Sequence, residues 1–325
     1  MATNVEFLKL VHTAFSNHVV NYFSFDEHTF THYTSVDGFL SIIEKSEIWF
    51  SNISDVNDIT EFEYGLQEVI LPCIKDYKFN DTTLNQKLLE AIKEIQGRNF
   101  SFLYEDKIKH SPASIFLFCC SKTENSTLLW NLYSKNTNRD GFSITFDIKN
   151  LRDSLLNKAE TDKNKPDAPY AHYLVPGKII YDLDEQKKIV QDYLDCLEFN
   201  LNKSENEETK NHILRIFVEK LFIMTLLMKS SDFCNENEIR FILIMDDDGL
   251  SVPQEGVERN SNLIFRNVSG FISSKISFKF DRDTIKHIHI SPFSKQDNIM
   301  PTSKYFLKKY GLKEIEIIHT EPKMR

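Results

Sequence analysis

Two carboxylates beside a cation are the strongest chemical signal in this sequence. Glu236 and Glu238 stand directly before an apolar run, and Arg240 follows at the same spacing of two residues. Side chains two residues apart on a β-strand point to one face, so we expect these three groups to lie together. Arg240 would hold one carboxylate, and the other could accept a hydroxyl proton or stabilise a cationic transition state. An ion pair at a sheet edge, without chemistry, is the alternative.

Polar side chains near the N-terminus could contact a nucleotide. His32 and Thr34, followed by Ser35, stand at the end of an expected strand. Imidazole and hydroxyl groups at such a place can hold a ribose or a phosphate. The alternative is a core histidine followed by hydroxyl residues that cap the next helix.

A second polar group follows the next expected strand. It consists of Ser51, Asn57, Asp58 and Glu61. Their oxygen atoms could line a pocket or bind a divalent metal ion. A polar turn followed by a helix cap would use the same residue types and needs no ligand.

Two aromatic residues and two histidines complete the set of side chains with possible chemical roles. Trp130 and Tyr133 are three residues apart, so they share one helix face and could stack on a planar ring. Packing in the hydrophobic core is their alternative role. His287 and His289 share a strand face, but no third metal ligand stands near them in the sequence. Cys120 lies in an apolar run, which is typical of an inert buried thiol.

Several common activities lack their sequence signals. The chain contains no Gly-rich phosphate loop, no H-E-x-x-H and no G-x-S-x-G. Its formal net charge of -9 provides no overall attraction for nucleic acid. The 5 cysteines include no Cys-x-x-Cys pair and the N-terminus lacks signal-peptide features, so we expect a reduced, cytoplasmic protein. The most apolar window, residues 213–228, is charged and too short to span a bilayer, so no membrane association is expected.

The elements that must position these groups follow one another irregularly. Apolar spacing predicts helices at residues 4–22, 37–44, 62–70, 84–95, 128–133, 184–229 with a break near 202–208, and 302–310. Apolar runs predict strands at residues 30–34, 48–51, 114–120, 142–146, 175–181, 238–245, 263–267, 275–280, 285–290 and 315–320. The polar composition of residues 157–171 predicts a loop. This order favours one α+β domain, residues 1–325, with a mixed, mostly antiparallel central sheet, flanking helices and a helical insertion at 184–229.

Taken in order, several motifs resemble a known bacterial family. They are His32-Tyr33-Thr34-Ser35, Trp49-Phe50-Ser51, Asn57-Asp58 with Glu61, Trp130-x-x-Tyr133, Gly141-Phe142-Ser143-Ile144-Thr145-Phe146, Lys229 with Phe233, Glu236-x-Glu238-x-Arg240, and Ile288-His289-Ile290-Ser291-Pro292. Their order is similar to that of the family called domain of unknown function 2971, with Ser291 where that family usually has Gly. The family-like core would span residues 26–295.

The same layout resembles, more distantly, the ADP-ribosyltransferase superfamily, which implies a fold of that type. In that superfamily a first-strand His holds a ribose hydroxyl of NAD, an aromatic ring stacks on nicotinamide, and a late Glu favours an oxocarbenium-like transition state. These roles would fall to His32 with Thr34, to Tyr133 or Trp130, and to Glu238 or Glu236. The catalytic residues would be Glu238, Glu236 and His32, and the nucleotide-binding residues His32, Tyr33, Thr34, Ser51, Asn57, Asp58, Trp130, Tyr133 and Arg240.

The resemblance implies an NAD-dependent ADP-ribosyltransferase or NAD glycohydrolase, with NAD as the substrate. Such an activity would suit a toxin or a phage-defence effector that modifies a macromolecular target, together with a partner protein of a defence system. A metal-dependent nuclease or phosphoesterase would instead use Asp58, Glu61, Glu236 and Glu238. A non-catalytic module that senses a nucleotide or binds a protein is the third possibility. Whether His32, Ser51 and Glu238 line one pocket separates these hypotheses.

Overall fold

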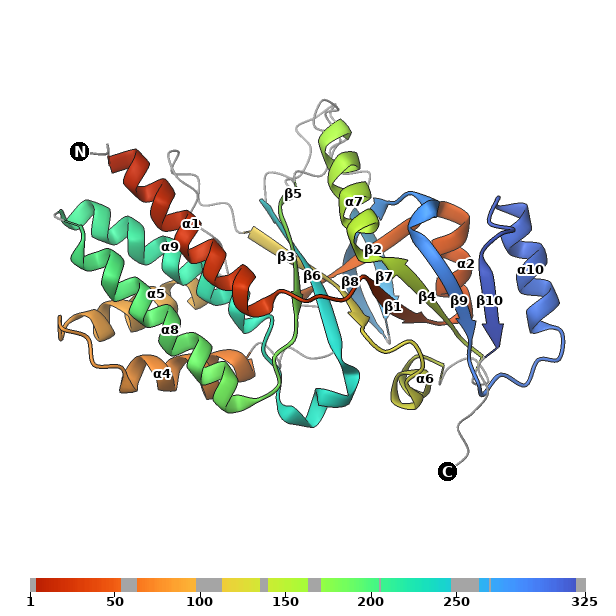
Figure 1. The fold of residues 1–325 in the computed structure, drawn as a ribbon, viewed down its shortest axis with the longest axis horizontal. Coiled ribbons are helices and arrows are strands. Elements are labelled where there is room, and N and C mark those ends of the chain that lie inside the picture. The colour runs from red at the N-terminus through yellow and green to blue at the C-terminus, as the bar shows by residue number, and fades with distance from the viewer. Residues whose placement is uncertain are drawn as a thin grey trace.

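The part of the chain that the structure describes combines one ten-stranded sheet with helices on both sides (Figure 1). The structure is a computed structural model and describes residues 4–53, 63–97, 113–134, 140–162, 171–204, 206–246, 263–268 and 270–319. The strands are β1 (Thr29–Thr34), β2 (Glu47–Asn52), β3 (Ala113–Ser121), β4 (Phe142–Asp147), β5 (Ala171–Lys178), β6 (Glu238–Asp246), β7 (Leu263–Val268), β8 (Phe271–Lys279), β9 (Ile285–Ile290) and β10 (Glu316–His319).

The sheet is mixed and mostly antiparallel, as the sequence predicts. Along its main path the order is β10-β9-β4-β1-β3-β2-β8-β7, and β6 and β5 continue from β3. The pair β10 with β9 is parallel, and the other described pairs are antiparallel. Strand β3 is the centre of the arrangement, because β6 pairs along its whole length while β1 and β2 pair with different parts of it. The expected α+β class is therefore confirmed.

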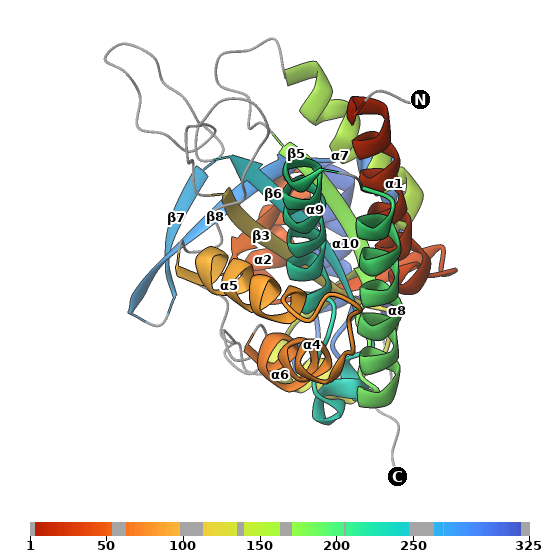
Figure 2. The ribbon, with the colours of Figure 1, turned by 90° about the vertical axis from the view of Figure 1, so that its left-hand side faces the viewer.

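Helices cover the sheet in two groups. They are α1 (Asn4–Phe23), α2 (Val36–Lys45), α4 (Leu71–Asp76), α5 (Leu84–Gly97), α6 (Thr127–Tyr133), α7 (Ile148–Asp162), α8 (Leu183–Asn202), α9 (Glu207–Thr225) and α10 (Ile299–Lys309), with the π-helix η2 (Gly65–Ile70) and the 3-10 helices η3 (Ser231–Glu236) and η5 (Arg282–Thr284). Helices α1, α4, α5, α8 and α9 gather on the side that faces the viewer in Figure 2. Helices α2 and α10 lie at the other side of the molecule in Figure 1, and α7 stands above the middle of the sheet.

Strand β6 separates two hydrophobic cores. Ile242 and Ile244 pack into the helical core formed with α1, α5, α8 and α9. Ile239, Phe241 and Leu243 alternate with them and pack into the second core, which includes α2, α7 and α10. This alternation follows from the two-residue period of a strand. Glu238 and Arg240 have the same parity as Ile242, so their side chains belong to the face that carries the helical core.

The predicted helical region at 184–229 is confirmed, with its break between α8 and α9. Both helices pack on α1 and are part of the helical core rather than a separate unit. The close approach of η2 to the end of α9 requires a glycine: a Cβ atom on Gly65 would lie 2.9 Å from the Thr225 carbonyl oxygen.

The predicted loop at residues 157–171 is wrong in extent, and the helix before it, α7, was not predicted. The sequence predicts a loop at residues 157–171, but α7 continues to Asp162. Lys158, Ala159 and Glu160 are strong helix formers, and their propensity prevails over the polar composition that suggested a loop. Strand β5 then begins at Ala171.

Strand β7 forms one end of the sheet path and pairs with β8 among the described residues. Two large apolar side chains are exposed on this hairpin, Phe265 at 61% and Ile272 at 79%. No helix in the described ranges is long and apolar enough to cross a membrane.

Candidate functional site

Four charged side chains meet at the start of β6 and form what we call the ion cluster: Lys229, Glu236, Glu238 and Arg240. The Lys229 Nζ atom donates to Glu236 Oε2 at 2.7 Å and to Glu238 Oε2 at 3.0 Å. Arg240 holds Glu238 through two bonds, from Nε to Oε1 at 2.7 Å and from Nη2 to Oε2 at 3.2 Å. Both oxygen atoms of Glu238 are therefore bound by cations.

Glu236 reaches the cluster by a route that strand periodicity does not predict. Strand β6 begins at Glu238, and Glu236 is the last residue of η3, so the expectation that both share a strand face is wrong. Asn237 between them has a φ of 45°, a left-handed conformation that Asn tolerates, and it turns the chain from η3 into β6. The Lys229 ammonium group is what joins the two carboxylates.

Hydrogen bonds fix the ion cluster to the surrounding elements. The Glu238 backbone N–H donates to the Tyr181 hydroxyl at 2.9 Å, and Ser121 Oγ donates to the Glu236 carbonyl oxygen at 2.7 Å. Arg240 Nη1 donates to the Leu226 carbonyl oxygen just beyond α9 at 2.8 Å. The cluster thus joins the helical layer to β3 and β6.

The Glu238 carboxylate is a fixed negative charge. Burial alone would raise its pKa, but Arg240 and Lys229 outweigh burial and lower the pKa to about 2. A carboxylate with so low a pKa is a poor proton acceptor near neutral pH. Burial, followed by the charge of Glu238, raises the pKa of the neighbouring Cys119 thiol. Cys119 is therefore a protonated thiol and not an activated nucleophile.

Tyr133 is the accessible aromatic residue beside the ion cluster. Its side chain is 47% exposed, and burial of its hydroxyl, Cys119 and the carboxylates Glu238 and Glu236 raise the pKa of that hydroxyl. Trp130 is fully buried, and its Nε1 donates to Asn125 Oδ1 at 3.1 Å. Of the two predicted stacking residues, Tyr133 can meet a ligand and Trp130 has the core role.

Tyr33 positions the helix that carries Tyr133. Its ring contacts Trp130 edge-on at 4.8 Å and lies nearly parallel to the Tyr133 ring at 6.4 Å. Its hydroxyl donates to the Thr123 carbonyl oxygen at 2.8 Å and accepts the Ser126 N–H at 2.9 Å. Tyr33 therefore holds both ends of the loop before α6, a structural task that the sequence analysis did not predict.

His32 and Thr34 lie on the opposite face of β1. His32 has the parity of Phe30, which packs in the second core, and its ring lies 4.7 Å from the Phe118 ring. Its Nδ1 atom is 3.1 Å from the Cys119 carbonyl oxygen, and burial lowers its pKa to about 4. Ser35 caps α2 by accepting the Gly38 N–H, as in the capping alternative.

The second predicted polar group does not join the ion cluster. Ser51 accepts a hydrogen bond from Lys275 Nζ at 2.7 Å and pairs with Leu117 of β3. Glu238 pairs with Ser121, four residues further along β3 and roughly 13 Å away. His32, Ser51 and Glu238 therefore do not line one pocket. The remaining predicted residues of this group, Asn57, Asp58 and Glu61, lie outside the described residues.

The comparisons with known proteins concern the segment that contains the ion cluster and Tyr133. Residues 129–241 match the profile of a family described as Protein of unknown function (DUF2971). The chain is therefore similar to DUF2971 proteins over this segment, which contains Trp130, Tyr133 and the four residues of the ion cluster. No curated protein and no solved structure matches the chain. The motifs that contain His32 and Pro292 lie outside the matched segment.

Two contributors to this site have weak sequence signals. Lys229 is part of the family-like motifs, but its role of neutralising two carboxylates depends on a contact across seven and nine residues of chain. Tyr181 follows the β5 strand and is separated from Glu238 by 57 positions. Apolar periodicity predicts where a helix or strand begins and ends. It does not predict which distant side chain a polar residue at such an end will contact.

Proposed function

We propose that the chain binds NAD against Tyr133 and cleaves its bond between nicotinamide and ribose, with Glu236 as the carboxylate beside the ribose. The observation that supports this most strongly is an exposed aromatic ring next to a carboxylate that a buried cation holds in place. Tyr133 is the exposed ring, Lys229 is the cation, and the Glu236 side chain is 19% exposed.

The proposed reaction breaks the bond between the nicotinamide ring nitrogen and C1′ of the ribose. The bonding electron pair stays on nicotinamide, which leaves as a neutral molecule. The ribose becomes oxocarbenium-like, and a carboxylate nearby stabilises that positive charge. Water, or a nucleophile of a macromolecular target, then attacks C1′ and loses a proton. The first acceptor makes a glycohydrolase, and the second an ADP-ribosyltransferase such as a toxin or defence effector.

Glu236 suits this role better than the other residues of the predicted set. Glu238 is enclosed by Lys229 and Arg240, so its charge is already compensated and it acts by positioning Lys229. His32 faces the second core and is not part of the proposed site. The nuclease alternative has less support, because Glu236 and Glu238 are paired with cations that a metal ion would have to displace.

Non-catalytic sensing of a nucleotide is the second candidate. It is favoured by the separation of His32 and Ser51 from Glu238, since an ADP-ribosyltransferase-like layout would bring these three to one pocket. In this case Tyr133 would stack on the nucleotide and the ion cluster would be a structural support.

The experiment measures NAD binding by calorimetry and nicotinamide release by chromatography on the same protein. We expect binding, release, and about 5- to 150-fold loss of affinity in Tyr133→Ala, because stacking of an aromatic ring on a base contributes about 1–3 kcal/mol. In Glu236→Gln we expect release to fall by about 100-fold with the affinity for NAD largely kept. Repeating the assay with labelled NAD and a cell lysate identifies a macromolecular acceptor.

Leu132→Ala is the matched control, because Leu132 is an exposed neighbour of Tyr133 on α6 and has no proposed role. Binding that depends on Tyr133 without nicotinamide release supports the sensing function. Absence of both binding and release, or equal values in Tyr133→Ala and Leu132→Ala, overturns the proposal.

A further inference from the structure

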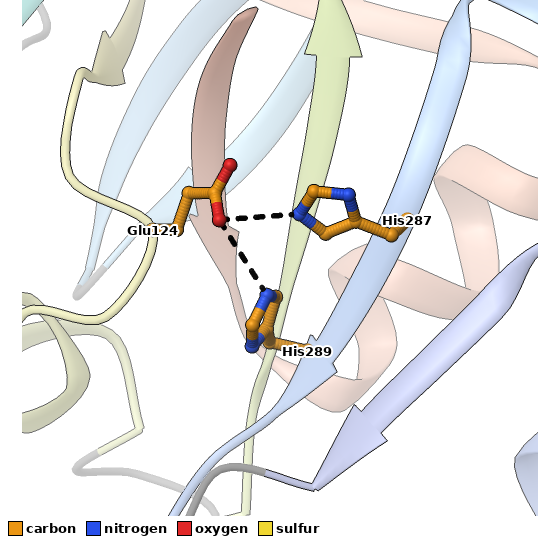
Figure 3. A group of neighbouring side chains, drawn as sticks. All are labelled: Glu124, His287 and His289. Atoms are coloured by element: carbon orange, nitrogen blue, oxygen red, sulfur yellow. Dashed lines mark ion pairs between the residues drawn. The ribbon is translucent and has the colours of Figure 1, made fainter.

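A second cluster of polar side chains lies on the same sheet, away from the ion cluster. Figure 3 shows that Glu124 and the rings of His287 and His289 point toward one another. The Glu124 Oε2 atom is 3.4 Å from His287 Nε2 and 3.9 Å from His289 Nε2. One ligand atom from each of the three residues lies within 4.8 Å of the others.

Two separate parts of the fold hold these three residues. His287 and His289 are two residues apart on β9, so both rings are on one face, and they pair with Thr145 and Ser143 of β4. Glu124 lies in the loop between β3 and α6. That loop is fixed by the Tyr33 hydroxyl, which binds the backbone on both sides of Glu124, at residues 123 and 126.

The environment of the histidines points to a ligand. The Nε2 atom of His287 is buried and has no hydrogen-bond partner among the residues that the structure describes. Ser143 Oγ on the adjacent strand is in the same condition. A buried polar atom without a partner is costly, and native proteins normally satisfy such atoms with protein, water or an ion.

We propose that Glu124, His287 and His289 bind a divalent transition-metal ion such as Zn²⁺. Two ligand atoms at about 2.1 Å from one ion, at a tetrahedral angle, are about 3.4 Å apart. The distance from Glu124 to His287 is 3.4 Å and meets this geometry, the distance from Glu124 to His289 is longer at 3.9 Å, and the ligand atoms of the two histidines lie within 4.8 Å of each other.

The ligand set selects the class of ion. Two imidazole nitrogens with one carboxylate suit Zn²⁺, Fe²⁺ and related first-row ions, whereas Mg²⁺ and Ca²⁺ prefer sites built from oxygen alone. Three protein ligands leave at least one position for water or another small ligand, as in catalytic rather than structural zinc sites. The half-exposed side chain of Glu124 leaves that position open to solvent.

The metal site is separate from the ion cluster. The register places His287, Thr145, Thr31, Ser121 and Glu238 in one row across neighbouring strands. Four strand spacings of roughly 4.8 Å put His287 roughly 19 Å from Glu238 along the sheet. The metal site therefore shares no residue with the ion cluster or with Tyr133, and metal binding is measured separately from NAD binding and nicotinamide release.

The test titrates chelator-treated protein with Zn²⁺ by calorimetry and with Co²⁺ by visible absorption, with Mg²⁺ as the comparison ion. We expect one equivalent of Zn²⁺ or Co²⁺, a Co²⁺ spectrum with nitrogen ligation, and no binding of Mg²⁺ at the same concentrations. His287→Ala and Glu124→Gln should each weaken binding by on the order of 100-fold, since even the loss of a residue that only supports a ligand costs about 10–100-fold.

Glu124→Gln changes a loop side chain to one of nearly the same size and shape, so this variant should fold. It therefore tests the proposal even if a histidine variant fails to fold. His319→Ala is the matched control, because His319 is an exposed histidine on the adjacent strand β10. Lack of Zn²⁺ and Co²⁺ binding by the wild type overturns the proposal. Unchanged affinity and spectrum in Glu124→Gln and His287→Ala, or an equal loss in His319→Ala, also overturn it.

Discussion

At the scale of single residues, Glu238 is the charge on which the ion cluster depends. Glu238→Gln leaves Lys229 and Arg240 with less compensation in a buried place, and breaking such a network costs about 3–5 kcal/mol. We expect the free energy of unfolding in urea to fall by that amount. The control Glu314→Gln should leave it unchanged, because the Glu314 side chain is 85% exposed. An equal effect of both substitutions would contradict the structural role of Glu238.

The same carboxylate makes stability depend on acid pH. Its pKa falls from 4.5 to about 2 on folding, so the folded state favours the ionised form. This contribution is complete above about pH 4.5 and is lost as the pH falls toward 2, and it amounts to about 3 kcal/mol. The free energy of unfolding in urea should decrease less between pH 5 and pH 3 in Glu238→Gln than in the wild type. Parallel decreases in both proteins would rule out this source.

His32 makes stability depend on pH at a higher range. Burial lowers its pKa from 6.5 to about 4, so the folded state excludes a proton that the unfolded chain accepts. The contribution of His32 to the free energy of unfolding is fully present above about pH 6.5 and is lost as the pH falls toward 4. The loss between pH 7 and pH 5 is about 2 kcal/mol. His32→Phe should flatten this part of the profile, and the exposed control His28→Phe should retain the wild-type slope. Loss of the slope in the control alone would refute the role of His32.

Some residue positions were within reach of sequence reasoning and others were not. Two-residue alternation places His32 on the side of Phe30, which already indicates a core position. The same alternation predicts that Glu238 and Arg240 share a face, and the structure has them bound to each other. Glu124 could not be found in this way, because its partners His287 and His289 are about 160 residues away and a loop has no periodicity. Contacts between residues far apart in the chain leave no periodic pattern in the local sequence, so they cannot be predicted from it.

At the scale of elements, the loop between β3 and α6 depends on one hydroxyl. Tyr33→Phe removes the group that pairs with the Thr123 carbonyl and the Ser126 N–H, and buried groups left unpaired cost about 1–3 kcal/mol. We expect lower stability and faster hydrogen exchange at the Ser126 amide. The exposed Tyr305→Phe is the control, and similar exchange in the two variants would contradict this function of Tyr33.

Element types were more predictable than their exact extent. Strong periodicity identifies α8, α9 and the strands of the sheet, because these elements bury one or both faces. Helix α7 was not predicted at all, and its last residues, 157–162, fall in the segment whose polar composition predicted a loop. The start of β6 at Glu238 was predicted, but η3 and the left-handed Asn237 before it were not, because neither has an apolar periodicity.

At the scale of the whole molecule, the two hydrophobic cores share β6 and should unfold together. Ile242 and Leu243 are adjacent, fully buried, and point into different cores. Replacing either residue with Ala should lower the free energy of unfolding by about 2–5 kcal/mol. Each variant should still show a single calorimetric transition, and the midpoint temperature should fall to a similar extent in both. Two transitions, of which Ile242→Ala moves one and Leu243→Ala the other, would show that the cores unfold separately.

The open sheet also affects how copies of the protein meet at high concentration. Strands β7 and β10 end the described sheet path at opposite ends, so their outer backbone groups can each accept another strand. Addition of the β7 edge of one molecule to the β10 edge of the next is a head-to-tail contact, which leads to linear growth wherever its rotation does not close a ring. The exposed Ile272 beside β7 favours such growth, and a lysine at this position would oppose it by charge.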